Sequence, residues 1–94
     1  MKRDYEKSSG NVFADLGFEP AEAAILEMRA RLMSDLRGFI KSSGMTSTEA
    51  AKRLKIGRSR VANLMKGQWE EFSLEMLITL EARVGRKVTL ELAA

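Results

Sequence analysis

Apolar residues recur at helical spacing over most of the chain and alternate with polar residues only near its end. From Pro20 to Ile40 they follow at intervals of three and four, which predicts one long helix. Pro20 suits its first turn, and Gly44 is expected to end it. Its main apolar stripe comprises Ile25, Met28, Leu32, Leu36, Phe39 and Ile40, with a neighbouring one at Leu26, Ala30 and Met33. This apolar arc is wider than a surface helix needs, so the helix is either sandwiched in the core or meets a partner.

Two shorter amphipathic segments follow and are joined by a tight turn. Thr46 or Ser47 caps the first, and Thr46 with Glu49 fits a capping box. The residues expected to face inward are Ala50, Ala51 and Leu54 in the first helix, and Val61, Leu64 and Met65 in the second. Helices joined by three residues nearly touch where they cross, which explains the two small alanines. Gly67 is expected to end the second helix.

The remaining segments flank these helices. Residues 1–10 mix charges with Ser and Gly and are predicted to be a mobile tail. Residues 11–18, NVFADLGF, either fold onto the core or contact another protein. A further helix is capped by Ser73 and stopped by Gly85, and residues 87–92 alternate polar and apolar, which predicts a strand. We therefore predict one mainly α domain over residues 11–94, with four to five helices and a C-terminal β-strand.

The amino-acid composition excludes several kinds of functional site. The 94 residues include neither Cys nor His, which excludes disulfides, Cys/His zinc sites, thiol nucleophiles and His bases. We expect no cofactor and no enzymatic activity. No apolar run approaches the ~20 residues of a membrane span, so we expect a cytoplasmic protein. Residues 47–66 hold six basic residues and one acidic residue, whereas the whole chain has a net charge of only +3. Positive charge concentrated on one helical pair is typical of a phosphate-binding surface.

The sequence of the helical pair resembles that of a known protein family. Thr46 to Gly67 resemble the helix-turn-helix of the XRE family, the class of Cro and phage repressors. Taken with NVFADLGF, the long helix, FSLEML and the terminal strand, the chain resembles a subgroup of bacterial antitoxins that pair with RelE-like toxins. Lys55 replaces the usual turn Gly, so it must adopt a left-handed conformation or the turn must differ. Gly57 replaces the usual Ser or Thr cap.

The resemblance implies roles by matching position. The candidates for contacts with base edges are Arg58, Ser59, Arg60 and Asn63. The candidates for contacts with phosphates are Thr46, Ser47, Lys52 and Lys66. The alternative to DNA contact is that each basic residue is only a solvated charge. In that case Ser47 only caps a helix, and Asn63 is an ordinary exposed helix residue.

The predicted strand needs a partner, because a lone strand leaves its backbone groups unpaired. The simplest partner is the same strand in a second subunit, so the predicted dimerisation residues are Lys87, Val88, Thr89, Leu90, Glu91 and Leu92. With a two-fold axis at Thr89, Lys87 lies opposite Glu91, a favourable pair. The edge of a toxin's sheet and the segment at Val12 and Phe13 are alternative partners.

The leading functional hypothesis is a DNA-binding repressor that binds a palindromic operator as a homodimer. The resemblance adds an antitoxin role, in which the protein represses its own operon and neutralises a RelE-like toxin. NVFADLGF and the second stripe of the long helix are either toxin contacts or ordinary core. The alternatives are a stand-alone or phage-derived regulator without a toxin, and a module that binds an acidic protein.

Overall fold

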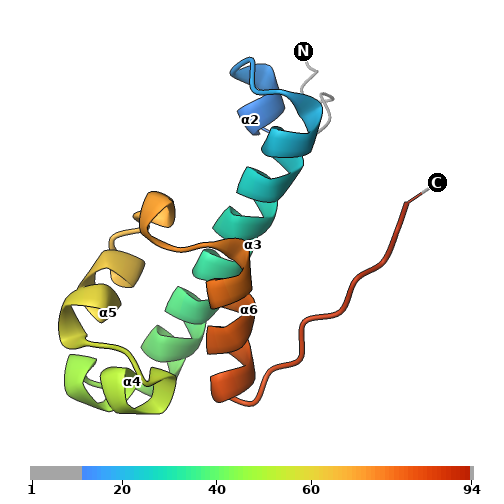
Figure 1. Ribbon diagram of the computed structural model, residues 1–94. Helices are drawn as coiled ribbons and strands as arrows, with labels where there is room; N and C mark the ends of the chain where they lie inside the picture. Colours follow the sequence, from blue (N-terminus) through green and yellow to red (C-terminus); the bar gives the residue numbers. More distant parts are fainter. Residues whose placement is uncertain (1–11, 94) are drawn as a thin grey trace.

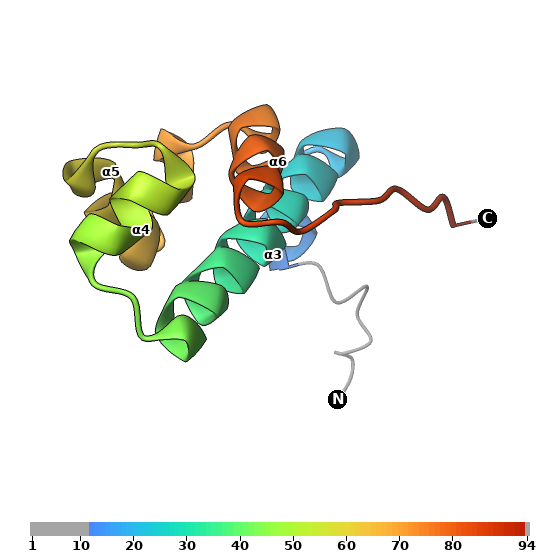
Figure 2. The ribbon, with the colours of Figure 1, turned by 90° about the horizontal axis from the view of Figure 1, so that it is seen from below.

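The computed structural model describes residues 12–93, which form helices and connecting loops (Figure 1). In chain order these are α2 (Val12–Asp15), α3 (Pro20–Ser43), α4 (Ser47–Leu54), α5 (Arg58–Met65), the 3-10 helix η1 (Trp69–Glu71) and α6 (Leu74–Arg83). α3 is the central element: α2 folds back on its start, and α4, α5 and α6 gather around its second half (Figures 1 and 2). The predicted mobile tail, residues 1–10, lies outside the described residues.

Local chemistry sets the helix ends as predicted. α3 begins at Pro20, and Gly44 ends it in the left-handed conformation at φ 67°. Thr46 and Glu49 form the capping box of α4: the Glu49 amide donates to Thr46 Oγ1 at 3.1 Å, and the Thr46 amide donates to Glu49 Oε1 at 2.9 Å. Ser73 caps α6 by accepting from the Met76 amide at 3.1 Å. These contacts fix where each helix starts and therefore how the helices can be joined.

The core lies between the second half of α3 and the three helices that follow it. Its fully buried members include Leu36, Leu54, Leu64, Phe72 and Leu77. The buried residues of α3 are Ala23, Leu26, Met33, Leu36 and Ile40. The buried face of α3 differs in part from the predicted one. Leu26 and Met33 of the neighbouring stripe are buried, whereas Ile25 and Met28 of the main stripe are exposed. Both stripes are apolar, so periodicity alone could not choose between them.

Residues 12–18 fold partly onto the rest of the chain, and Asn11 lies outside the described residues. Phe13 is half-buried and packs edge-to-face on Trp69, with ring centroids 6.0 Å apart, and on Phe18 at 6.1 Å. Val12 and Leu16 remain exposed on α2. The aromatic side of this segment thus joins the fold, and its aliphatic side remains available to a partner.

The predicted C-terminal strand is wrong, and with it the predicted fold class. The structure contains no β-strand within residues 12–93, and residues 86–93 have no regular secondary structure. The proposed dimerisation strand, Lys87, Val88, Thr89, Leu90, Glu91 and Leu92, instead leads away from the helices as an irregular segment (Figure 1). The physical reason is that a strand needs a paired neighbour, and this part of the chain supplies none. The mainly helical architecture with a helix-turn-helix is present.

Candidate nucleic-acid interface

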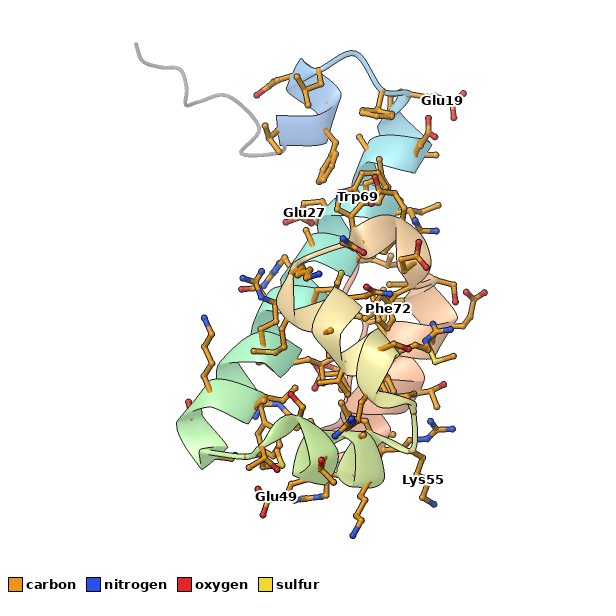
Figure 3. The ribbon with its side chains drawn as sticks, turned by 90° about the vertical axis from the view of Figure 1, so that its left-hand side faces the viewer. Glu19, Glu27, Glu49, Lys55, Trp69 and Phe72 are labelled. Atoms are coloured by element: carbon orange, nitrogen blue, oxygen red, sulfur yellow. The ribbon has the colours of Figure 1, made fainter. Side chains whose placement is uncertain are left out.

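The turn between α4 and α5 spans residues 55–57 and is held by backbone hydrogen bonds. Lys55 adopts φ 60° and ψ 43°, the left-handed conformation, and its amide donates to the Ala51 carbonyl. The Ile56 amide donates to the same carbonyl at 3.1 Å. Gly57 is extended, and its carbonyl accepts the first amide bonds of α5. The chain therefore changes direction within three residues, and Lys55 points away from the body (Figure 3).

The corner formed by α4 and α5 is closely packed. Ala50 and Leu54 on α4, and Val61 and Leu64 on α5, are all at most 1% exposed. Arg83 of α6 closes the corner from outside, because its Nη1 donates to the Leu54 carbonyl at 2.8 Å. That bond occupies a carbonyl in the last turn of α4, where a cation is favourable. The bond thereby ties the end of α4 to α6.

The outer face of α5 is polar and basic. Ser59, Ala62 and Lys66 are exposed and Asn63 is half-buried, and their spacing of three and four residues places them on one side of the helix. Val61 and Leu64 occupy the opposite, buried side. A helix that presents such a face beyond a packed corner has the geometry for insertion into a DNA major groove.

Arg58 lies at one edge of this outer face. Its side chain is exposed, and Nη1 donates to Thr48 Oγ1 on α4 at 3.4 Å. A hydrogen bond this long at the surface is weak. The guanidinium is therefore free to exchange Thr48 for a base edge or a phosphate.

Arg60 occupies the other edge and is turned inward. Its Nη2 donates to the Glu71 carbonyl at 3.1 Å, and its guanidinium lies 5.0 Å from the centre of the Phe72 ring. Arg60 Nε is buried and has no hydrogen-bond partner among the described residues. Phe72 itself lies inside the fold (Figure 3). The structure thus separates Arg60 from the outward group of Arg58, Ser59 and Asn63, and links it to the end of η1.

Comparison with protein families agrees with this geometry. Residues 12–93 match the family described as Helix-turn-helix domain. The chain belongs to this helix-turn-helix family. Comparison with curated proteins finds no match. Because helix-turn-helix domains place their second helix in the major groove, membership supports DNA binding by α5.

The four phosphate candidates of this helix-turn-helix domain lie at the ends of α4 and α5. Ser47 and Lys52 are exposed on α4, and Lys66 is exposed directly after α5. Thr46 already accepts the Glu49 amide as a cap, which leaves its hydroxyl proton available for a phosphate oxygen.

Three residues with a place in this interface were not predicted from the sequence. Thr48 contacts Arg58, and Arg83 holds the end of α4. Ala62 is exposed at the centre of the outer face, where its methyl group suits the methyl group of a thymine. The spacing of Ser59, Ala62 and Lys66 at three and four residues could have placed Ala62 on the outer face. Nothing in the sequence connects Arg83 with Leu54.

Within the described range, no group of three His, Cys, Asp or Glu side chains is placed to hold a metal ion. No helix in the same range is long and apolar enough to cross a membrane.

Proposed function

We propose that this helix-turn-helix protein is a sequence-specific transcriptional repressor that reads its operator with α5. The observation that carries the proposal is the exposed polar face of Ser59, Asn63 and Lys66, presented beyond a corner whose apolar side chains are buried. The basic excess over residues 47–66 would supply affinity for phosphates, and the outer face would supply discrimination between bases.

The experiment is a fluorescence-anisotropy titration of the DNA upstream of the gene and of a scrambled duplex, over a range of salt concentrations. We expect tighter binding to the upstream DNA and a steep salt dependence on both. Asn63→Ala should reduce the preference for the upstream DNA, because it removes a donor–acceptor pair suited to adenine. Lys66→Gln should weaken both duplexes similarly and lower the salt slope by about 1. Equal affinity for both duplexes would contradict base reading.

The proposal extends to an antitoxin role, in which a RelE-like toxin binds at the other end of α3. Residues 12–28 contain four acidic residues and no Lys or Arg. In the same region Val12, Leu16 and Ile25 are exposed. Glu19 and Lys55 lie at opposite ends of the molecule (Figure 3). This acidic and apolar end is complementary to a basic protein surface and leaves the DNA-binding corner unobstructed.

Co-expression with the product of a neighbouring toxin-like reading frame tests this extension. We expect the two proteins to co-purify, and Leu16→Asp to abolish the complex while preserving DNA binding. Lys66→Gln is the matched control, which should preserve the complex. Without a neighbouring toxin gene, or without a complex, the alternative of a stand-alone or phage-derived regulator of the XRE type would replace the antitoxin proposal.

The proposed repressor acts as a homodimer in the cytoplasm, without catalysis. Leu90 and Leu92 are 78% and 85% exposed in the single chain, and a second subunit would bury such side chains. A two-fold dimer would read a palindrome with half-sites about 34 Å apart. Sedimentation at micromolar concentration tests the dimer: a monomer at concentrations that saturate the operator would contradict it.

A further inference from the structure

The second half of α3 carries two cations on the side that meets the end of α5. Arg37 and Lys41 are one turn apart, and the acidic residue of this helix half, Asp35, lies on the opposite side. The Arg37 guanidinium reaches the backbone just after α5, because a methyl group on Gly67 would stand 3.3 Å from Arg37 Nη1. Lys66, a predicted phosphate contact, precedes Gly67 and is exposed. The basic surface of the helix-turn-helix therefore continues onto α3.

The charged end of Arg37 has no partner among the described residues. Its side chain is half-buried, and its Nε is buried without a hydrogen-bond partner. The two Nη nitrogens are not buried, and no described carboxylate pairs with them. Packing thus holds the stem of the side chain while both Nη nitrogens remain accessible from solvent. A guanidinium with two free Nη nitrogens suits the oxygens of a phosphate.

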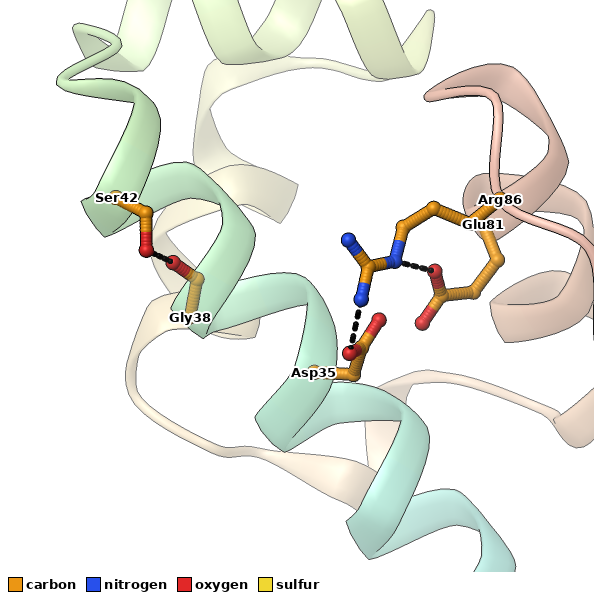
Figure 4. Close-up of polar contacts among 5 residues, drawn as sticks. All are labelled: Asp35, Gly38, Ser42, Glu81 and Arg86. Atoms are coloured by element: carbon orange, nitrogen blue, oxygen red, sulfur yellow. Dashed lines mark hydrogen bonds and ion pairs between the residues drawn. The ribbon is translucent and has the colours of Figure 1, made fainter.

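The arginine on the opposite side of α3 is compensated by carboxylates. Arg86 Nη2 donates to Asp35 Oδ1 at 2.6 Å, and Arg86 Nε lies 3.3 Å from Glu81 Oε1 (Figure 4). Burial raises the pKa of Glu81 from 4.5 to about 7, the hydrogen bond and the negative charge of Asp35 add to the rise, and the charge of Arg86 opposes it. The fold therefore surrounds Arg86 with acidic groups, whereas Arg37 lies beside the basic residue Lys66.

We propose that Arg37 binds a phosphate of the DNA backbone, so that α3 extends the contact made by Lys66 at the end of α5. Its Nη nitrogens would donate to the phosphate oxygens, which positions the domain on the duplex without reading bases. A cation beside a helix C-terminus also interacts favourably with the helix dipole, and that interaction alone would make Arg37 a stabilising residue of α5. The inference rests on the proposed binding of DNA by α5.

DNA titrations of charge-matched variants over a range of salt concentrations test the proposal. Arg37→Gln and Arg31→Gln each remove one positive charge from α3, but Arg31 is exposed on another side of the helix, near the C-terminal segment. We expect Arg37→Gln to lower the salt slope by about 0.9 and the affinity about fivefold at about 0.1 M salt, on the upstream DNA and the scrambled duplex alike. Arg31→Gln should leave the slope unchanged, and Arg37→Lys, which keeps the charge, should retain most of it.

The outcomes distinguish this inference from the proposed function. Equal slopes for Arg37→Gln and Arg31→Gln would overturn the phosphate contact, because any loss would then reflect net charge alone. A lower stability of Arg37→Gln in urea unfolding, with an unchanged salt slope, would also overturn it and assign Arg37 to the end of α5. Equal affinity of the unsubstituted protein for both duplexes would contradict base reading by α5, yet the slope difference would still support Arg37. A protein that binds neither duplex would overturn both.

Discussion

Arg60 and Arg58 are two residues apart on α5, yet the structure predicts different consequences when each is replaced by alanine. Arg60→Ala removes the hydrogen bond to the Glu71 carbonyl and the contact with the Phe72 ring. Arg58→Ala removes only a long surface hydrogen bond to Thr48. The pair is therefore a matched test of whether an arginine of α5 holds the helix in place or contacts DNA.

The expected magnitude for Arg60 follows from its two contacts. A hydrogen bond from a charged group contributes about 1.5–3 kcal/mol and less where it is exposed, as this one is, and a cation–π contact contributes about 0.5–2 kcal/mol. The buried Nε without a partner offsets part of this gain. We expect Arg60→Ala to lower the free energy of unfolding by about 1–2 kcal/mol, which corresponds to a decrease in Tm of about 5–10 °C. Arg58→Ala should stay within about 0.5 kcal/mol of the parent.

Urea unfolding and DNA titration of both variants provide the measurement. If Arg60 positions α5, Arg60→Ala should weaken binding to all duplexes by a similar factor, and Arg60→Lys should restore part of the stability. If Arg58 contacts a base, Arg58→Ala should lose affinity mainly on the operator, by about 1–3 kcal/mol. An Arg60→Ala protein of unchanged stability that loses only operator binding would refute the positioning role and restore Arg60 as a base contact.

Three further predictions concern the scaffold. Because the pKa of Glu81 is raised from 4.5 to about 7, its contribution to stability is full below pH 4.5 and is lost as pH rises through 7. Urea unfolding should show a loss of up to about 3 kcal/mol between pH 5 and pH 8, and Glu81→Gln should flatten this dependence. Lys55→Gly should stabilise the protein by about 0.5–1 kcal/mol, because φ 60° strains a residue with a side chain; lower stability in thermal unfolding would contradict this. Arg83→Met should cost about 1–2 kcal/mol by leaving the Leu54 carbonyl without its donor, and an unchanged denaturation midpoint would show that water replaces the guanidinium.

The parts of the structure that were predictable from the sequence are those that nearby residues determine. The capping box of Thr46 and Glu49 joins residues three apart, and the stop at Gly44 depends on one backbone conformation. These features placed the end of α3 and the start of α4 correctly. For Lys55 the sequence left two alternatives, a left-handed conformation or a different turn, and the structure shows the left-handed one.

The parts that were not predictable depend on residues far apart in the chain. Alternation at residues 87–92 indicated a strand, but a strand exists only where another one pairs with it. Arg60 contacts a turn eleven residues further on, and its orientation follows from where that turn lies. The sequence likewise showed no acidic pair in an apolar setting, although the fold places Asp35 beside Glu81, 46 residues later. In each case tertiary packing decided what local pattern could not.

The placement of opposite charges at the two ends of α3 has a kinetic consequence. A 24-residue helix is about 36 Å long, so the acidic residues near its start and the basic corner beyond its end form a large electric dipole. In the field of a DNA duplex this dipole produces a torque that turns the basic end toward the phosphates before contact. If α5 binds DNA as proposed, collisions would be oriented with α5 leading, and added salt should slow association by screening the torque as well as the attraction.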